Sequence, residues 1–146
     1  MKEVFVFKLF IIVFITSSTA QVKVANYSIG RYGTERYEHL SFWIKDGKRN
    51  YIEYLYGAKP KEIKLIFLGQ TILNDKRYLK VKFPNKYVLF INADGTKLSV
   101  NDEKGKYSKV FTWEYEGPVN GIGTYCDICA ENEEEAIQIV KANYLQ

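Results

Sequence analysis

Cys126 and Cys129 are the residues whose type and spacing could most directly carry out chemistry. They are the only cysteines in the chain, and they form a Cys-x-x-Cys pair just before a segment with helical periodicity. Such a pair can close a local disulfide, remain as two unpaired thiols, act as a redox centre or help to bind a metal. An oxidising compartment favours the disulfide, so we predict a small structural bridge between Cys126 and Cys129.

The cysteine pair leaves one enzymatic alternative open, a thiol oxidoreductase. A helix start lowers the pKa of a nearby thiol, but the acidic run Glu133–Glu135 beside the pair acts in the opposite direction. A structural zinc site needs about four ligands. Only His39 and scattered carboxylates could complete such a site, and their spacing matches no known pattern. The sequence therefore predicts no metal and no cofactor.

His39 is the only histidine in the chain. A catalytic base needs a nucleophile to serve and a group that orients it, and no Gly-x-Ser-x-Gly motif is present. We therefore expect His39 to be a surface residue on a strand. Glu114 and Glu116 are spaced like a glycosidase pair, but charged residues often alternate on strand faces. The sequence predicts no catalytic residue.

The most distinctive loop, residues 116–126, joins the last expected strand to the helix. Its glycines do not form a phosphate-binding fingerprint, because no third glycine or helix start follows at the right distance. The loop is either a connector or a binding loop beside the cysteines, since functional residues favour loops on rigid scaffolds. The binding-loop candidates are Gly117, Pro118, Asn120, Gly121, Gly123 and Tyr125.

Residues 1–20 have the pattern of a secretory signal peptide. Lys2 provides the positive start, Leu9–Ile15 is the uninterrupted apolar run, and small residues precede a cut after Ala20. This run is shorter than the roughly 20 residues that a spanning helix needs. We expect an exported protein, secreted or periplasmic, with one β-rich domain over residues 21–146 and no transmembrane segment in the mature chain.

The chain is mildly basic, with a formal net charge of +4. Its lysines and carboxylates are interspersed, and no run of basic residues is dense enough to indicate nucleic-acid binding. The sequence predicts no nucleic-acid partner.

Alternation of apolar and polar residues predicts a series of short strands from about residue 36 to residue 116. In residues 62–69, for example, Ile63, Leu65 and Phe67 share one face. Asp46-Gly47 and Asp94-Gly95 are typical of tight hairpin turns. With turns about every ten residues, we expect a single antiparallel β-barrel or sandwich of about seven or eight strands.

One α-helix is expected at the C-terminal end, over about residues 132–144. Asn132 is a good N-cap, and the acidic residues after it lie at the positive end of the helix dipole. Ala136, Ile137, Val140 and Tyr144 form one apolar stripe.

These features together favour an exported, non-enzymatic binding protein for a protein or a small ligand. Twelve tyrosines and two tryptophans supply side chains that suit such contacts. Two alternatives remain open, a secreted inhibitor of another enzyme and the thiol oxidoreductase. No motif of a known family can be placed on the chain.

Overall fold

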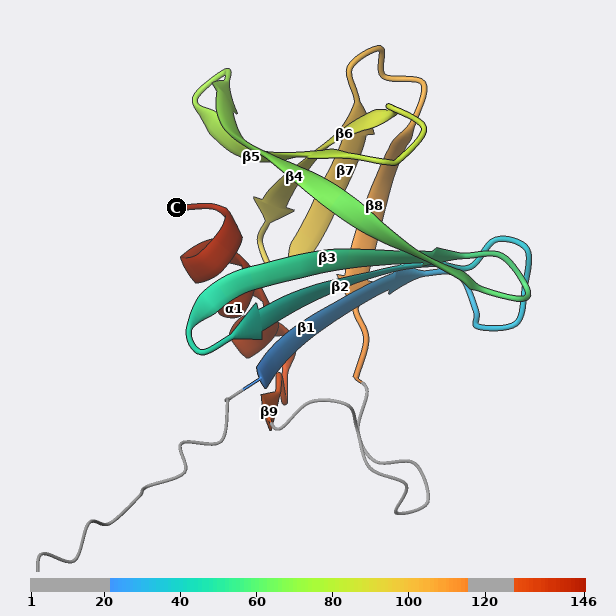
Figure 1. Ribbon diagram of the computed structural model, residues 1–146, viewed down its shortest axis with the longest axis horizontal. Helices are drawn as coiled ribbons and strands as arrows, with labels where there is room; N and C mark the ends of the chain where they lie inside the picture. The colour runs from blue at the N-terminus through green and yellow to red at the C-terminus, as the bar shows by residue number, and fades with distance from the viewer. Residues whose placement is uncertain (1–21, 116–127) are drawn as a thin grey trace, which may run out of the picture.

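The computed structural model describes residues 22–115 and 128–146. Eight strands form a closed antiparallel barrel, and one helix follows at the C-terminal end, as expected for the fold class (Figure 1). The elements in chain order are β1 (Val22–Ile29), β2 (Glu38–Lys45), β3 (Lys48–Tyr56), β4 (Lys61–Leu73), β5 (Lys76–Lys82), β6 (Val88–Asp94), β7 (Lys97–Asp102), β8 (Ser108–Trp113), β9 (Ile128–Cys129) and α1 (Glu133–Tyr144).

The barrel closes at β1. This strand pairs with β2 along its whole length, and its Tyr27 and Ser28 pair with Trp113 and Thr112 of β8. Near the start of β1, Lys23 and Val24 instead pair in parallel with the two-residue strand β9. The sequence expectation began near residue 36 and missed both β1 and β9. The outer face of β1 carries both polar and apolar residues, so the sequence does not show the regular alternation of apolar and polar positions that indicates a strand.

Tight turns join neighbouring strands because their residues tolerate a positive φ. Asp46 and Gly47 have φ values of 52° and 70°, and Asn74 and Asp75 have 50° and 61°, as a two-residue hairpin turn requires. Between β6 and β7 the turn is shifted by one residue. Asp94 still pairs with Lys97, so the turn consists of Gly95 and Thr96 rather than Asp94-Gly95.

β4 is the strand at which the barrel wall bends. Its first part pairs with β3 as far as Leu65, and from Ile66 onward it pairs with β5 instead. A bulge between Phe67 and Gly69 accompanies this change, and Gly69 has a φ of 119°. Because a bulge bends a strand, β4 leaves β3 and opens a gap between the two strands.

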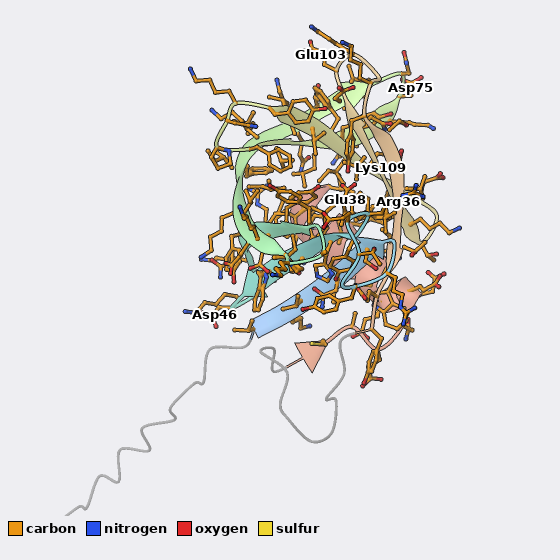
Figure 2. All side chains as sticks on the ribbon, turned by 90° about the vertical axis from the view of Figure 1, so that its right-hand side faces the viewer. Arg36, Glu38, Asp46, Asp75, Glu103 and Lys109 are labelled. Carbon is orange, nitrogen blue, oxygen red and sulfur yellow. The ribbon has the colours of Figure 1, made fainter. Side chains whose placement is uncertain are left out.

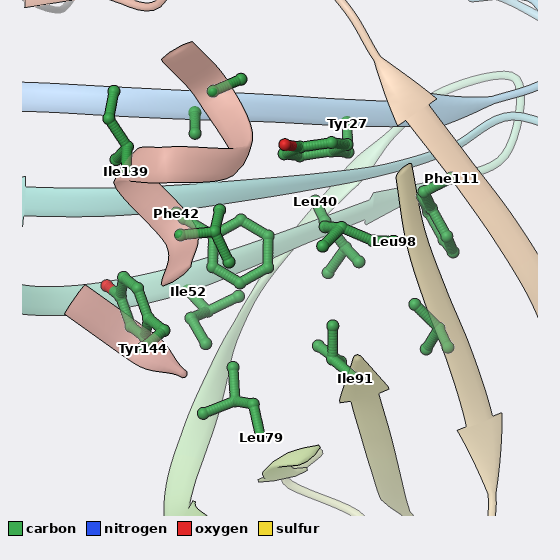
Figure 3. Close-up of a cluster of buried hydrophobic side chains, with 14 of the residues drawn as sticks. Tyr27, Leu40, Phe42, Ile52, Leu79, Ile91, Leu98, Phe111, Ile139 and Tyr144 are labelled. Carbon is green, nitrogen blue, oxygen red and sulfur yellow. The ribbon is translucent and has the colours of Figure 1, made fainter. Parts of the chain in front are cut away.

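The barrel interior is filled by side chains that alternate along the strands (Figure 3). Leu40 and Phe42 of β2 belong to one buried cluster with residues from every other long strand. The rings of Phe42 and Tyr144 of the helix meet edge to face, with their centroids 5.3 Å apart. The buried strand residues are Ala25, Tyr27, Leu40, Phe42, Ile44, Ile52, Tyr54, Leu65, Leu79, Val81, Leu89, Ile91, Leu98, Val100 and Phe111.

α1 begins and packs largely as the sequence predicts. The side chain of Asn132 accepts a hydrogen bond from the backbone N–H of Glu135 at 2.9 Å. The four residues of the expected stripe are buried, and Ile139 joins them. The helix covers one end of the barrel: Glu133 accepts a hydrogen bond from Thr96, and the carbonyl of Tyr144 accepts one from Gln70 of β4.

Candidate functional site

A buried carboxylate lies at the end of the barrel opposite the helix. Glu38 points inward, and its side chain accepts hydrogen bonds from Tyr54 Oη at 2.8 Å, from Tyr107 Oη at 2.5 Å and from Lys109 Nζ. Glu38 and Lys109 are labelled in Figure 2. Burial raises the pKa of Tyr54 to about 12, so its hydroxyl remains a donor at neutral pH. Three donors satisfy the Glu38 carboxylate, which indicates a structural role.

A second polar network lies on the outer face of β2, around His39. The Glu114 carboxylate can only accept, so His39 Nδ1 donates to Glu114 Oε2 at 3.0 Å. His39 Nε2 lies 2.7 Å from Ser41 Oγ, and Tyr37 Oη donates to Glu114 Oε2 at 3.3 Å. The expectation of a surface histidine was wrong: His39 is 1% exposed, because tertiary packing covers the outer face of the strand there.

The order Ser41, His39, Glu114 resembles the hydrogen-bond chain of a serine hydrolase. Two observations argue against that activity. Ser41 is only 4% exposed, so a substrate cannot approach its hydroxyl. Ser41 also lies in the middle of β2, where it pairs with Asn26 of β1 and Glu53 of β3. The backbone N–H groups there are hydrogen-bonded to the neighbouring strands, so they are not available to form an oxyanion hole. The network ties β2 to the segment that follows β8.

Exposed apolar side chains are concentrated on β4 beyond the bend. Ile72 is 64% exposed, and its apolar neighbours on the same strand are also exposed. We call these exposed residues the β4 patch: Ile66, Phe67, Leu68, Ile72 and Leu73. Phe67 and Ile72 pair with Val81 and Arg77 of β5 and lie on one face of the strand, whereas Ile66 and Leu73 pair with Lys82 and Lys76 and lie on the other face. The alternation placed Phe67 on one face with Ile63 and Leu65, which are half-buried and buried, but Phe67 is exposed because β4 has already left β3 at that point.

The β4 patch also lies along a free strand edge. From Ile66 to Leu73, β5 is the only strand among the described residues that pairs with β4. A strand edge with unpaired backbone groups and apolar side chains can pair with another extended chain. Apolar patches of this kind mark interaction surfaces more often than isolated exposed residues do.

Two neighbouring hollows lie in the gap between β3 and β4. The first is a polar groove of about 540 Å³, whose lining includes Lys48, Arg49, Gln70 and Asn143. The second is a pocket of about 230 Å³ with apolar and aromatic walls from Ile52, Leu65, Phe67, Tyr51 and Tyr144. Arg49 lines both hollows, and its guanidinium carbon lies 4.2 Å from the centroid of the Phe67 ring. The cation–π contact holds this charge at the boundary of the two hollows.

Most of the predicted site residues lie outside the residues that the structure describes. Residues 116–127 are not among the described residues, so this applies to all the binding-loop candidates: Gly117, Pro118, Asn120, Gly121, Gly123 and Tyr125. Cys129 lies at the end of β9, but Cys126 and Glu116 also fall outside, so the disulfide and the carboxylate pair stay untested.

Sequence reasoning missed the β4 patch and Arg49. The only signal in the sequence is the apolar run Leu65–Leu68, which is apolar on both faces and therefore does not reveal its exposure.

The class of protein that the architecture defines is a closed eight-stranded antiparallel β-barrel with one C-terminal helix. No known protein family, no curated protein and no solved structure matches the chain. Among the described residues, no three His, Cys, Asp or Glu side chains are placed to hold a metal ion together. None of the helices in the described part of the chain has the length and apolar character needed to span a membrane.

Proposed function

We propose that this chain is an exported, non-enzymatic binding protein that contacts a protein partner through the β4 patch. The single observation that carries the proposal is the exposure of five large apolar side chains along one free strand edge. A partner segment in extended conformation could hydrogen-bond to that edge and cover the apolar side chains at the same time.

A protein partner is favoured over a small ligand held inside the barrel. The interior of an eight-stranded barrel is just wide enough for side chains to fill or for one small ligand. Here large side chains such as Tyr27, Phe42 and Phe111 occupy it, each with 0% exposure. The partner could itself be an enzyme, in which case the protein would act as an inhibitor.

Export is supported by the pattern of residues 1–20 alone. The N-terminal residue of protein recovered from the medium or the periplasm tests it. We expect Gln21, and a chain that still begins at Met1 in those fractions would contradict export.

A phage library of random 12-residue peptides, panned against the immobilised protein, tests the binding surface. Enriched peptides are synthesised and titrated against the wild type, Ile72→Lys and Val110→Lys. Val110 is a matched control because it is also an exposed apolar strand residue, but on β8. Folding of each variant is checked by circular dichroism and thermal unfolding.

We expect Ile72→Lys to weaken binding at least about tenfold, since burial of an isoleucine side chain contributes about 1.5–3 kcal/mol. Val110→Lys should leave the affinity unchanged. Equal affinity for the wild type and Ile72→Lys, or no enrichment from the library, would refute the β4 patch as the contact surface.

A further inference from the structure

The gap between β3 and β4 carries charge as well as apolar surface. Lys48 and Arg49 line the polar groove, and both are exposed. Among residues 22–115 and 128–146, the carboxylates within 4.0 Å of a basic side-chain nitrogen are Glu38, beside Lys109, and Glu114, beside His39, and neither contact involves Lys48 or Arg49. Both cations are therefore exposed beside an apolar surface and are free to pair with a negative group of a partner.

The position of Arg49 determines how a negative group of the partner would be oriented. Its guanidinium faces the ring of Phe67, at the boundary between the polar groove and the apolar pocket. A guanidinium binds a carboxylate through two parallel hydrogen bonds, which fixes the orientation of the carboxylate. A ligand that uses both hollows must therefore carry an apolar group and a carboxylate close together.

We propose that the partner segment inserts one large apolar side chain into the pocket beside Tyr144 and pairs an adjacent carboxylate with Arg49. This inference rests on the proposed function and specifies the chemistry of the partner. The occupant is an extended, acidic segment of another protein, lying along the β4 patch with its carboxylate at the groove.

A second copy of the same chain fits this surface poorly. The β4 patch is flanked by Lys64 on β4 itself and by Lys76 and Arg77 on β5, and the carboxylate of Asp75 lies in the turn at its end. Pairing two copies through the β4 patch would bring these cations together in a protein that already has a net charge of +4. Like charges that face each other across a strand pair are destabilising. Charge complementarity selects an acidic partner.

The same 12-residue phage library supplies the probe. We expect the enriched peptides to place Asp or Glu within two or three positions of a large apolar residue. For the tightest peptide, replacing that acid by its amide should weaken binding to the wild type about tenfold, as expected for loss of a charge-assisted hydrogen bond.

Variants of Arg49 assign the effect to one side chain. In Arg49→Gln the peptide with the acid and its amide counterpart should bind equally. Arg49→Lys keeps the charge but loses the paired donors, so we expect it to retain only part of the discrimination. Arg31→Gln is the matched control, because Arg31 is an exposed arginine on the loop between β1 and β2, and it should discriminate as the wild type does.

The outcomes separate the two proposals. If the acid and amide peptides bind the wild type equally, or if Arg49→Gln still discriminates, the carboxylate assignment is wrong. Sensitivity to Ile72→Lys would in that case still support the β4 patch as the contact surface. If binding is insensitive to Ile72→Lys, or if no peptide is enriched, the proposed function and the inference both fail.

Discussion

The imidazole Nδ1 of His39 lies 3.0 Å from the carboxylate Oε2 of Glu114, although 75 positions separate the two residues in the chain. The contact joins the start of β2 to the segment just after β8. The backbone N–H of Glu114 also donates to the carbonyl of Asn26 in β1, at 2.9 Å. The pair therefore ties three segments together where the barrel closes.

The first prediction concerns the pH dependence of this contact. The hydrogen bond from His39 holds the pKa of the Glu114 carboxyl below its usual range, against the opposing effect of partial burial. A carboxyl whose pKa is lowered by folding stabilises the protein above its unfolded pKa, about 4.3, and this contribution is lost as the pH falls through the folded pKa.

We therefore expect Glu114→Gln to lower the free energy of unfolding at pH 7 by about 1 kcal/mol, a value reduced for solvent screening. Such a reduction is appropriate because the Glu114 side chain is 34% exposed. The difference from the wild type should shrink as the pH falls below the unfolded pKa of about 4.3 and through the lowered folded pKa. Urea unfolding at pH 7, 5, 4 and 3 measures it, with Glu103→Gln as an exposed control. A difference that is constant over this range would show that the charge of Glu114 has no part in it.

The second prediction concerns the carboxylate inside the barrel. Glu38→Ala should lower the free energy of unfolding by about 2–4 kcal/mol, because it leaves the hydroxyls of Tyr54 and Tyr107 without their acceptor. Lys109→Met should cost less, about 1 kcal/mol, since the Lys109 side chain is 41% exposed. Urea unfolding at pH 7 compares the two variants. A larger loss for Lys109→Met than for Glu38→Ala would mean that the ion pair, rather than the tyrosine contacts, is the main stabilising interaction.

The third prediction concerns how the helix is fixed to the barrel. Tyr144 Oη donates to the carbonyls of Trp43 at 2.5 Å and Tyr51 at 3.1 Å, so one hydroxyl links α1 to β2 and β3. Tyr144→Phe should lower the free energy of unfolding by about 1–2 kcal/mol, and Tyr144→Ala by about 3–5 kcal/mol because it also empties a core position. Thermal and urea unfolding measure both losses. Tyr32→Phe, at an exposed tyrosine, serves as the control and should change nothing. Full stability of Tyr144→Phe would show that water replaces the hydroxyl.

The fourth prediction concerns the cysteine pair, and it tests the disulfide that the sequence predicts. A bridge between Cys126 and Cys129 closes a very short loop, so the double change to serine should lower stability by about 2 kcal/mol at most. In the untreated native protein we expect no titratable thiol, and an intact mass two hydrogen atoms below that of the reduced chain. Two reactive thiols in that sample would contradict the bridge. A reduced pair with a thiol pKa well below about 8.5 would instead favour the oxidoreductase.

Local features of this fold could be read from the sequence because neighbouring residues decide them. Asp46-Gly47 forms the turn between β2 and β3, since both residues accept a positive φ. Asn132 caps α1, and Ala136, Ile137, Val140 and Tyr144 form its buried stripe, as their spacing predicts. Each of these features depends on residues within a turn or two of chain.

The tertiary structure alone decided which surfaces are covered. His39 has the sequence context of a surface residue, yet it is buried because Glu114 and Tyr37 are brought against it. Phe67 alternates with buried residues, yet it is exposed because β4 changes partners from β3 to β5. The position of Arg49 beside Phe67 follows from that same exchange. Burial and free strand edges depend on pairing between distant segments, and a period of two along one strand carries no information about which strand, if any, will lie beside it.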